Sequence, residues 1–261
     1  MRHAFLPGHR FLRVRCNEVD EGLPIVHIMA DGGGMRSFPL RRVHLWSLVL
    51  ALLMTASLAG AQGTATQHEE TQRPTSKPYS GDLSIFDYPD RDKKLQIDRV
   101  MDLLGITTGK NVADIGAGSG WFTVRAARRV GPTGAVIAED INPVAIESIG
   151  KRAIKEDLSN VRTVLGAPDD PRLPAGSVDA VLMLKVYHEI AHPVSTMKVL
   201  QRALRAGAKV GIIDRNGNGA NHGLRQDVVV REMAEAGYKL VGTYDFTKAD
   251  GQDYFLIFQV Q

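Results

Sequence analysis

The residues with the clearest chemical potential lie in the stretch N-V-A-D-I-G-A-G-S-G-W, residues 111–121. An acid, Asp114, stands inside a short apolar run, and glycines follow at positions 116, 118 and 120. Glycines have no Cβ, so a ligand can lie directly against their backbone. A helical pattern of apolar residues begins at Trp121, and the N-terminus of a helix presents free N–H groups. The stretch therefore predicts a strand, a glycine turn and a helix that together bind a ligand.

The spacing of the glycines restricts the chemistry of that ligand. A dinucleotide site of the form G-x-G-x-x-G would need a further glycine at position 121, where the sequence has Trp121. The motif here is D-x-G-x-G-x-G, with Asp114 two residues before the first glycine. A carboxylate is a poor neighbour for a pyrophosphate and a good one for a cation or an amino group. We therefore expect a cationic ligand, and an NAD-type oxidoreductase is the less favoured alternative.

The elements that must position this motif alternate along the chain. The strand at 178–184 is continuously apolar, which is typical of a strand buried on both faces of a parallel sheet. The last two strands have no helix between them, so we expect them to pair as an antiparallel hairpin. The pattern predicts a doubly wound sheet. Helices are expected after Asp90 and over 121–130, 143–155, 193–205 and 227–236, and strands over 110–115, 135–138, 161–165, 178–184, 209–213, 238–246 and 254–260.

The glycine motif and the terminal hairpin together resemble the class I S-adenosylmethionine (SAM)-dependent methyltransferases, of the type that acts on small molecules. The resemblance extends from about Phe86 to the end of the chain. It implies a three-layer, Rossmann-like α/β fold with a doubly wound sheet of seven strands that ends in an antiparallel hairpin. It also implies SAM as the cofactor, no metal, and direct in-line transfer of the methyl group to a small-molecule acceptor.

The resemblance also implies which residues bind the cofactor. The segment D-I-N-P at 140–143 resembles the acid-containing turn that holds the ribose hydroxyls, with Glu139 as the alternative to Asp140. After the third strand the family's G-D pair is interrupted, so two acids compete for the adenine amino group. The expected cofactor-binding residues are Asp114, Gly116, Ala117, Gly118, Gly120, Asp140, Ile141, Asp169, Asp170 and Lys185.

Candidate catalytic residues follow the fourth strand in K-V-Y-H-E-I, residues 185–190. In open α/β sheets, ligands bind outside the carboxyl ends of the strands, where this segment is expected. Histidine exchanges protons near neutral pH, so His188 could accept a proton from the methyl acceptor, with Glu189 orienting it. Tyr187 is the third catalytic candidate. The alternative is that His188 only packs against the donor or the next helix. Asp214 and His222 are expected on the substrate side of the same edge.

Composition and charge exclude other classes of function. The 261-residue chain has a net charge of +3, but residues 1–61 contain seven arginines and four acids. The remaining chain is balanced, with 25 basic and 25 acidic residues, so we expect no nucleic-acid partner. Cys16 is the only cysteine, which excludes an intrachain disulfide and a cysteine metal cluster.

The N-terminal region reads as a targeting segment. Residues 45–59 are apolar and uncharged, arginines at 36, 41 and 42 precede them, and A-G-A at 59–61 follows. This order predicts a secretory signal over 35–61, and hence an exported, periplasmic protein. The apolar run is shorter than the ~20 residues of a spanning helix, and an uncleaved inner-membrane anchor is the alternative.

We expect residues 1–34 to be an upstream extension, with translation starting at Met35. Residues 62–78 are polar and rich in Thr, Gln, Glu and Pro, which predicts a flexible linker. The SAM-dependent methyltransferase domain is expected over 79–261, acting as a monomer. A SAM- or nucleoside-binding protein without turnover is a further alternative.

Overall fold

The computed structural model describes residues 26–28, 36–38 and 73–261. The chain divides into two compact units, Met1–Gln67 and His68–Gln261. In the first unit, β1 (Val26–Ile28) pairs antiparallel with β2 (Arg36–Phe38). The apolar run at 45–59, predicted to be an export signal, lies outside the described residues. Within the described ranges, no helix combines the length and the apolar character needed to cross a membrane.

The second unit is built on a seven-stranded sheet with the order β5-β4-β3-β6-β7-β9-β8. The first five of these strands run parallel, and β9 pairs antiparallel with both β7 and β8. The predicted seven-stranded, doubly wound sheet with a terminal hairpin is therefore confirmed. The strands are β3 (Asn111–Ile115), β4 (Ala135–Asp140), β5 (Val161–Leu165), β6 (Val178–Leu184), β7 (Leu204–Asp214), β8 (Tyr238–Tyr244) and β9 (Tyr254–Val260).

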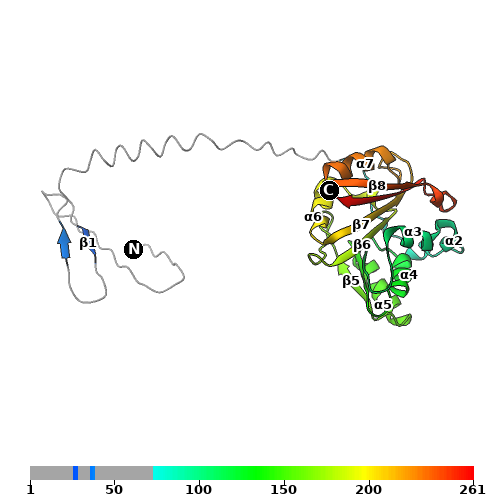
Figure 1. The fold of residues 1–261 in the computed structure, drawn as a ribbon, viewed down its shortest axis with the longest axis horizontal. Helices are drawn as coiled ribbons and strands as arrows, with labels where there is room; N and C mark the ends of the chain where they lie inside the picture. The colour runs from blue at the N-terminus through cyan, green and yellow to red at the C-terminus, as the bar shows by residue number, and fades with distance from the viewer. Residues whose placement is uncertain (1–25, 29–35, 39–72) are drawn as a thin grey trace. The chain divides into compact units, whose positions relative to one another are not determined.

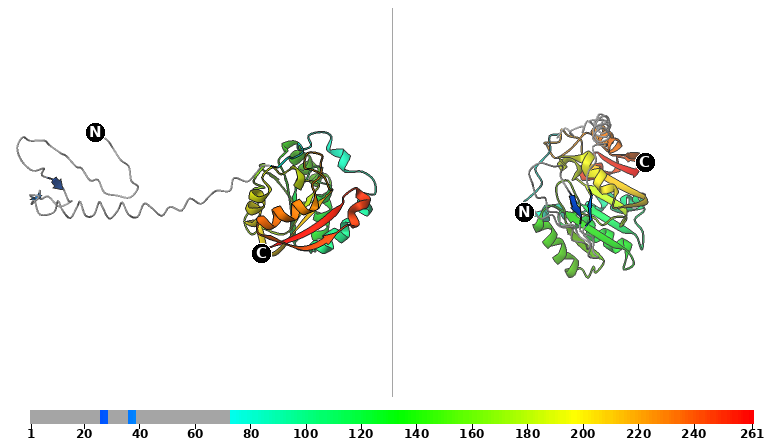
Figure 2. Two further views of the ribbon diagram at one scale, coloured as in Figure 1. Left: turned by 90° about the horizontal axis from the view of Figure 1, so that it is seen from above. Right: turned by 90° about the vertical axis from the view of Figure 1, so that its left-hand side faces the viewer.

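Helices cover both faces of this sheet (Figures 1 and 2). Side chains alternate between the faces of a strand, so the two faces of β6 bury different residues. Leu182 packs in the core under the first helical layer, and Met183 packs in the core under the second. The central strands are therefore apolar throughout. The first layer contains α3 (Ile97–Leu104), α4 (Trp121–Val130) and α5 (Pro143–Lys155), and the second contains α6 (Pro193–Gln201) and α7 (Gln226–Glu235).

Two helix boundaries differ from the predicted ones. The single helix expected after Asp90 is divided into α2 (Arg91–Leu95) and α3, because Gln96 adopts the left-handed conformation with φ of 52°. The Gln96 side chain donates to the carbonyl oxygen of Phe246, at the start of η4 (Phe246–Asp250), 150 residues away. Helix α6 ends at Gln201 rather than at residue 205, because Leu204 pairs with Val178 and starts β7.

Residues 73–78, expected to be part of a linker, pack against the domain. The Arg73 guanidinium forms an ion pair with Glu232 of α7 at 3.0 Å and donates to the carbonyl oxygen of Tyr187 at 2.6 Å. Ser76 is buried, and its hydroxyl donates to the carbonyl oxygen of Gly219 at 2.8 Å. The packed part of the domain therefore begins upstream of residue 79, and it continues into η2 (Leu83–Phe86).

Candidate functional site

The glycine turn joins β3 to α4 at the point where the strand order reverses between β3 and β6. Open α/β sheets bind ligands in the crevice at such a point. Gly116, Gly118 and Gly120 have φ values of 65°, 54° and 75°, a conformation that residues with a Cβ rarely adopt. The Gly118 N–H donates to the Asp140 carboxylate at 2.9 Å, which ties the turn to the end of β4. The glycine turn thus places main-chain atoms at the carboxyl edge of the sheet, where a ligand can approach them.

A cavity of about 400 Å³ lies against this turn. Its volume is within the usual range for a small-molecule or cofactor site. Gly120 is not on the wall, but it forms the left-handed N-cap of α4. The cavity wall includes most of the residues expected from the sequence, namely Asp114, Gly116, Ala117, Gly118, Asp140, Ile141, Lys185 and Glu189.

The cavity is rich in carboxyl groups. Burial raises the pKa of Asp114 to about 7, although the Thr123 hydroxyl donates to this carboxyl at 2.6 Å. Burial also raises the pKa of Glu139 to about 8, and it lowers the pKa of Lys185, the half-buried cation on the same wall. Raised carboxyl pKa values mean that the negative forms lack sufficient compensation, so a cationic ligand would stabilise them. The electrostatics of the wall therefore favour a positively charged ligand.

Asp140 is placed to bind a diol. Its two carboxylate oxygens accept from the backbone N–H groups of Gly118 at 2.9 Å and Asn142 at 2.8 Å. A carboxylate has about four acceptor positions, so two remain for ligand hydroxyls. The capping role belongs to Asn142, whose side chain accepts from the backbone of Val144 at the start of α5. Glu139, the alternative ribose acid, also lines the cavity, and its carboxylate lies 3.4 Å from the Gly116 N–H.

The structure does not bring Asp169 or Asp170 to the cavity wall, where one of them was expected to bind adenine. Both are exposed, and Asp170 accepts from the backbone N–H of Arg172 at 2.7 Å. Asp170 also forms a short antiparallel bridge with Ala167, which turns the chain there. The wall at this place is formed instead by Ala167 and Pro168. Asp170 stabilises a turn here, as Asp commonly does beside proline.

Several residues on the wall carried no signal in the sequence. Arg91 is only 4% exposed, its guanidinium lies 4.3 Å from the centroid of the Trp121 ring, and it donates to the carbonyl oxygen of Phe86 at 2.6 Å. The Phe86 ring packs edge-on against Tyr79, with their centroids 5.3 Å apart, and both line the cavity. These residues precede the first predicted strand, where no motif pointed to a site. Together they give the cavity an aromatic wall next to a buried cation.

His188 lies in η3 (Tyr187–Glu189), directly after β6. It is 2% exposed, and its Nδ1 lies 2.8 Å from the carboxylate of the fully buried Asp214. Glu189 was expected to orient this ring, but its carboxylate lies 3.8 Å from His188 Nε2, beyond hydrogen-bond distance. The residue that orients His188 is therefore Asp214, 26 positions along the chain. Burial raises the pKa of Glu189 to about 7.

Tyr187 was a catalytic candidate, but its side chain is fully buried in the hydrophobic core with α6 and α7. The Arg73 guanidinium lies 5.6 Å from the centroid of its ring. Burial raises the pKa of the Tyr187 hydroxyl well above its ordinary value. The residue does not line the cavity and has a packing role, because successive side chains of the short η3 helix point in different directions.

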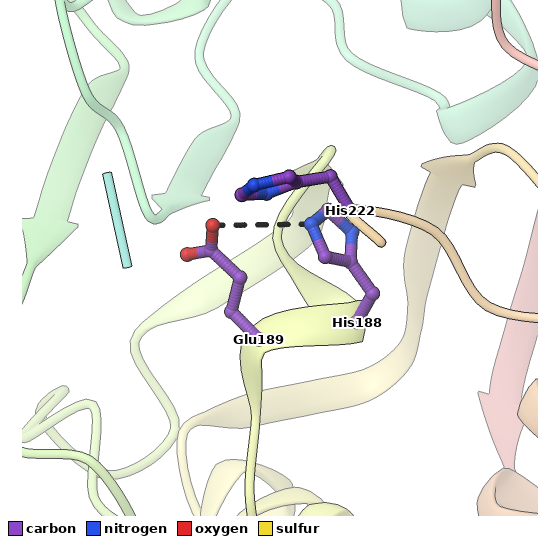
Figure 3. Close-up of side chains that lie close together, drawn as sticks. All are labelled: His188, Glu189 and His222. Atoms are coloured by element: carbon purple, nitrogen blue, oxygen red, sulfur yellow. Dashed lines mark ion pairs between the residues drawn. The ribbon is translucent and has the colours of Figure 1, made fainter. Parts of the chain in front are cut away.

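His222, expected on the substrate side, lies close to His188. The two imidazole rings are edge-on, with their centroids 5.9 Å apart. Figure 3 shows the Glu189 carboxylate and the His222 ring facing the same side of His188. The structure therefore joins the predicted residues His188, Glu189, Asp214 and His222 into one cluster beside the cavity.

Comparisons with known proteins find methyltransferases among the proteins similar to this chain. Residues 112–208 match a family model described as a methyltransferase domain. The matched segment begins in β3, contains the glycine turn and the His188–Glu189 segment, and ends within β7.

Two curated relatives are similar to about a third of the chain. Nocamycin O-methyltransferase from Saccharothrix syringae is 37% identical over 83 residues, which cover 32% of this chain and 30% of that protein. Aklanonic acid methyltransferase DauC from Streptomyces sp. (strain C5) is 37% identical over 84 residues, covering 32% of this chain and 38% of that protein. The chain thus matches less than two fifths of the length of either relative.

A solved structure extends the similarity to the whole domain fold. The crystal structure of a SAM-dependent methyltransferase from Aquifex aeolicus has a TM-score of 0.64 and 21% sequence identity, and the match covers 70% of this chain and 100% of that one. The fold predicted from the glycine motif and the terminal hairpin is confirmed by this likeness. The family match supports the methyltransferase interpretation of the site.

Proposed function

We propose that residues 73–261 form a SAM-dependent methyltransferase that acts on a small-molecule acceptor. The observation that carries the proposal is the acid-rich cavity against the glycine turn at the reversal of strand order. A ligand with ammonium and sulfonium cations suits the carboxyl groups of this cavity, and its ribose diol suits Asp140. Its flat base suits the apolar part of the wall that includes Ile141 and Pro168. When bound, SAM supplies a methyl group on a positively charged sulfur.

The residues of the chain divide this task between them. The 116–118 backbone and Asp114 would hold the amino acid part of SAM, and Asp140 would accept from the ribose hydroxyls. Ile141 and Pro168 would pack against the base. An already activated donor needs chiefly to be aligned with the acceptor, which explains why the cofactor residues are more recognisable than the catalytic ones.

His188, Glu189 and His222 face the acceptor side in this proposal. The names of the two curated relatives describe methyl transfer to small organic molecules, which supports an acceptor of that size. The role of His188 as a base stays a prediction. We further propose that the enzyme acts as a monomer without a nucleic-acid partner and that residues 35–61 export it.

Calorimetric titration of the full chain with SAM and with NADH tests the cofactor assignment. We expect SAM to bind and NADH not to bind, because buried carboxyls repel a pyrophosphate. Binding of NADH with no binding of SAM would overturn the proposal. Incubation with labelled SAM and a panel of small acceptors then tests turnover. Release of S-adenosylhomocysteine identifies an enzyme, and tight binding without release identifies a SAM-binding protein instead.

A further inference from the structure

His188, Glu189 and His222 form a group of metal-ligand type beside the cavity. One ligand atom from each residue lies within 4.8 Å of the other two. His188 and Glu189 come from the η3 turn after β6, and His222 comes from the loop after β7 (Figure 3). The donor set is two imidazole nitrogens and one carboxylate oxygen, which suits a first-row transition metal ion.

His188 is oriented as metal-binding histidines are. The Asp214 carboxylate lies 2.8 Å from His188 Nδ1. It also accepts hydrogen bonds from the backbone N–H groups of His188 at 3.4 Å and Arg215 at 2.9 Å. A carboxylate with these neighbours is an acceptor, so Nδ1 donates to it, and in the neutral ring Nε2 then has the free lone pair. Metal-ligating histidines typically donate their second nitrogen to a carboxylate in this way.

The free nitrogen of His188 has no partner in the structure. Nε2 is buried and makes no hydrogen bond, and the Glu189 carboxylate lies 3.8 Å from it. Leaving a buried polar atom unpaired is destabilising, because the atom has lost its hydrogen bonds to water. A metal ion between His188 and Glu189 would give both groups a partner.

His222 is held toward this nitrogen by its main chain. It adopts the left-handed conformation with φ of 57°, which is strained for a residue other than glycine. The buried hydroxyl of Ser76 accepts from the His222 backbone N–H at 2.7 Å, and Arg215 donates to its carbonyl oxygen at 2.7 Å. Residues 73–78, here called the strap, and the loop after β7 thus fix the His222 backbone, while the exposed imidazole can still rotate.

We infer that His188 Nε2, Glu189 and His222 bind one divalent transition metal ion of the Zn²⁺ type. Tetrahedral ligation at 2.0–2.1 Å needs donor atoms about 3.4 Å apart. The Glu189 and His222 side chains would close the remaining distance, since His188 is fixed by Asp214. This inference revises the expectation from the sequence that the protein has no metal site.

The position of the ion would deepen the proposed function, on which this role rests. Glu189 lines the cavity, so coordination positions not filled by the protein would face the ligand space. The acceptor would then be a molecule whose hydroxyl or carboxylate oxygen can coordinate the ion. Three protein ligands with an open position are the usual arrangement of catalytic zinc.

The experiment uses the full chain, prepared without a histidine tag, stripped with EDTA and dialysed against Zn²⁺ or Co²⁺. We expect about one ion per chain by elemental analysis, and a visible Co²⁺ absorption band of a low-coordinate site. His222→Ala and Glu189→Gln should each raise the Kd for Zn²⁺ at least tenfold. His222 is exposed, so its variant tests the site without disturbing the core. His192→Gln, which removes a histidine outside the cluster, should bind Zn²⁺ as the unaltered chain does.

SAM binding, measured on the same samples, separates this inference from the proposed function. If SAM binds and no ion is retained, or if His222→Ala retains the ion unchanged, the metal site is refuted and the methyltransferase proposal stands. In that case His188 is left as a candidate base. If the ion binds with the expected loss in both variants and SAM does not bind, the metal site stands and the methyltransferase proposal fails.

Discussion

A single added methyl group at Gly118 should separate ligand binding from backbone strain. Gly118 has φ of 54°, and a Cβ built there would meet its nearest atom, in the Phe86 ring, at 3.8 Å. The protein itself therefore has room for the methyl, which would project into the cavity where we place the ligand. Gly176 offers a matched control with φ of 57°, an exposed position, and no atom within 4 Å of an added Cβ.

The magnitudes follow from these two environments. An alanine in the left-handed region costs about 1 kcal/mol at either position, which lowers the Tm of a domain of this size by roughly 2–4 °C. Only Gly118→Ala also crowds the ligand. Overpacking by one methyl costs about 1–3 kcal/mol, which corresponds to a Kd for SAM raised roughly 5- to 150-fold. We expect Gly176→Ala to bind SAM normally.

The assay is calorimetric titration with SAM, paired with thermal unfolding of both variants. Equal SAM affinity in Gly118→Ala and the unaltered chain would show that the ligand does not contact the turn. Weakened binding in both variants to the same extent would refute the steric argument, because strain alone would then explain the loss.

Three further predictions concern pH, the N-terminal strap and export. Burial raises the pKa of Asp114 to about 7 and that of Glu139 to about 8, so the folded state binds these two protons more tightly than the unfolded state does. The protons therefore contribute fully to the free energy of unfolding below about pH 4. This contribution is lost as the pH rises to about 8. Denaturant unfolding at several pH values should show this decline, with a shallower slope in Asp114→Asn, and an unchanged slope in that variant would contradict it. Arg73→Met leaves the partly buried Glu232 of α7 without its ion-pair partner, and it should lower the free energy of unfolding by about 3–5 kcal/mol. Arg231→Met, on the exposed side of α7, should lower it by less than about 0.5 kcal/mol. Urea unfolding measures both changes. Leu50→Arg places a charge in the predicted signal, and inserting that charge into a membrane costs about 2.5–3.5 kcal/mol. Cell fractionation should then find the protein retained in the cytoplasm, and unchanged export would refute the signal.

The sequence predicted the fold because its signals are local. Hydrophobic runs of strand length, the glycine turn and the missing helix before β9 each involve neighbouring residues, and all of them agree on one sheet. The places of Asp114, Gly118 and Asp140 on the cavity wall were predictable for the same reason, since strand ends and turns fix them. The single helix expected after Asp90 was wrong because the conformation of Gln96 depends on a contact with residue 246.

Only the tertiary structure decided which side chains meet on the proposed acceptor side of the cavity. The partner of His188 is Asp214 and not its neighbour Glu189, because β6 and β7 are adjacent and end at the same edge. The approach of His222 depends on Ser76, 146 residues away, and on a strap that composition alone had assigned to a linker. Local patterns determine which elements form, but they carry no information on which side chains meet when distant elements pack. The sequence by itself therefore determined the sheet and its cofactor edge, and the packing of strands and strap decided which groups meet beside the cavity.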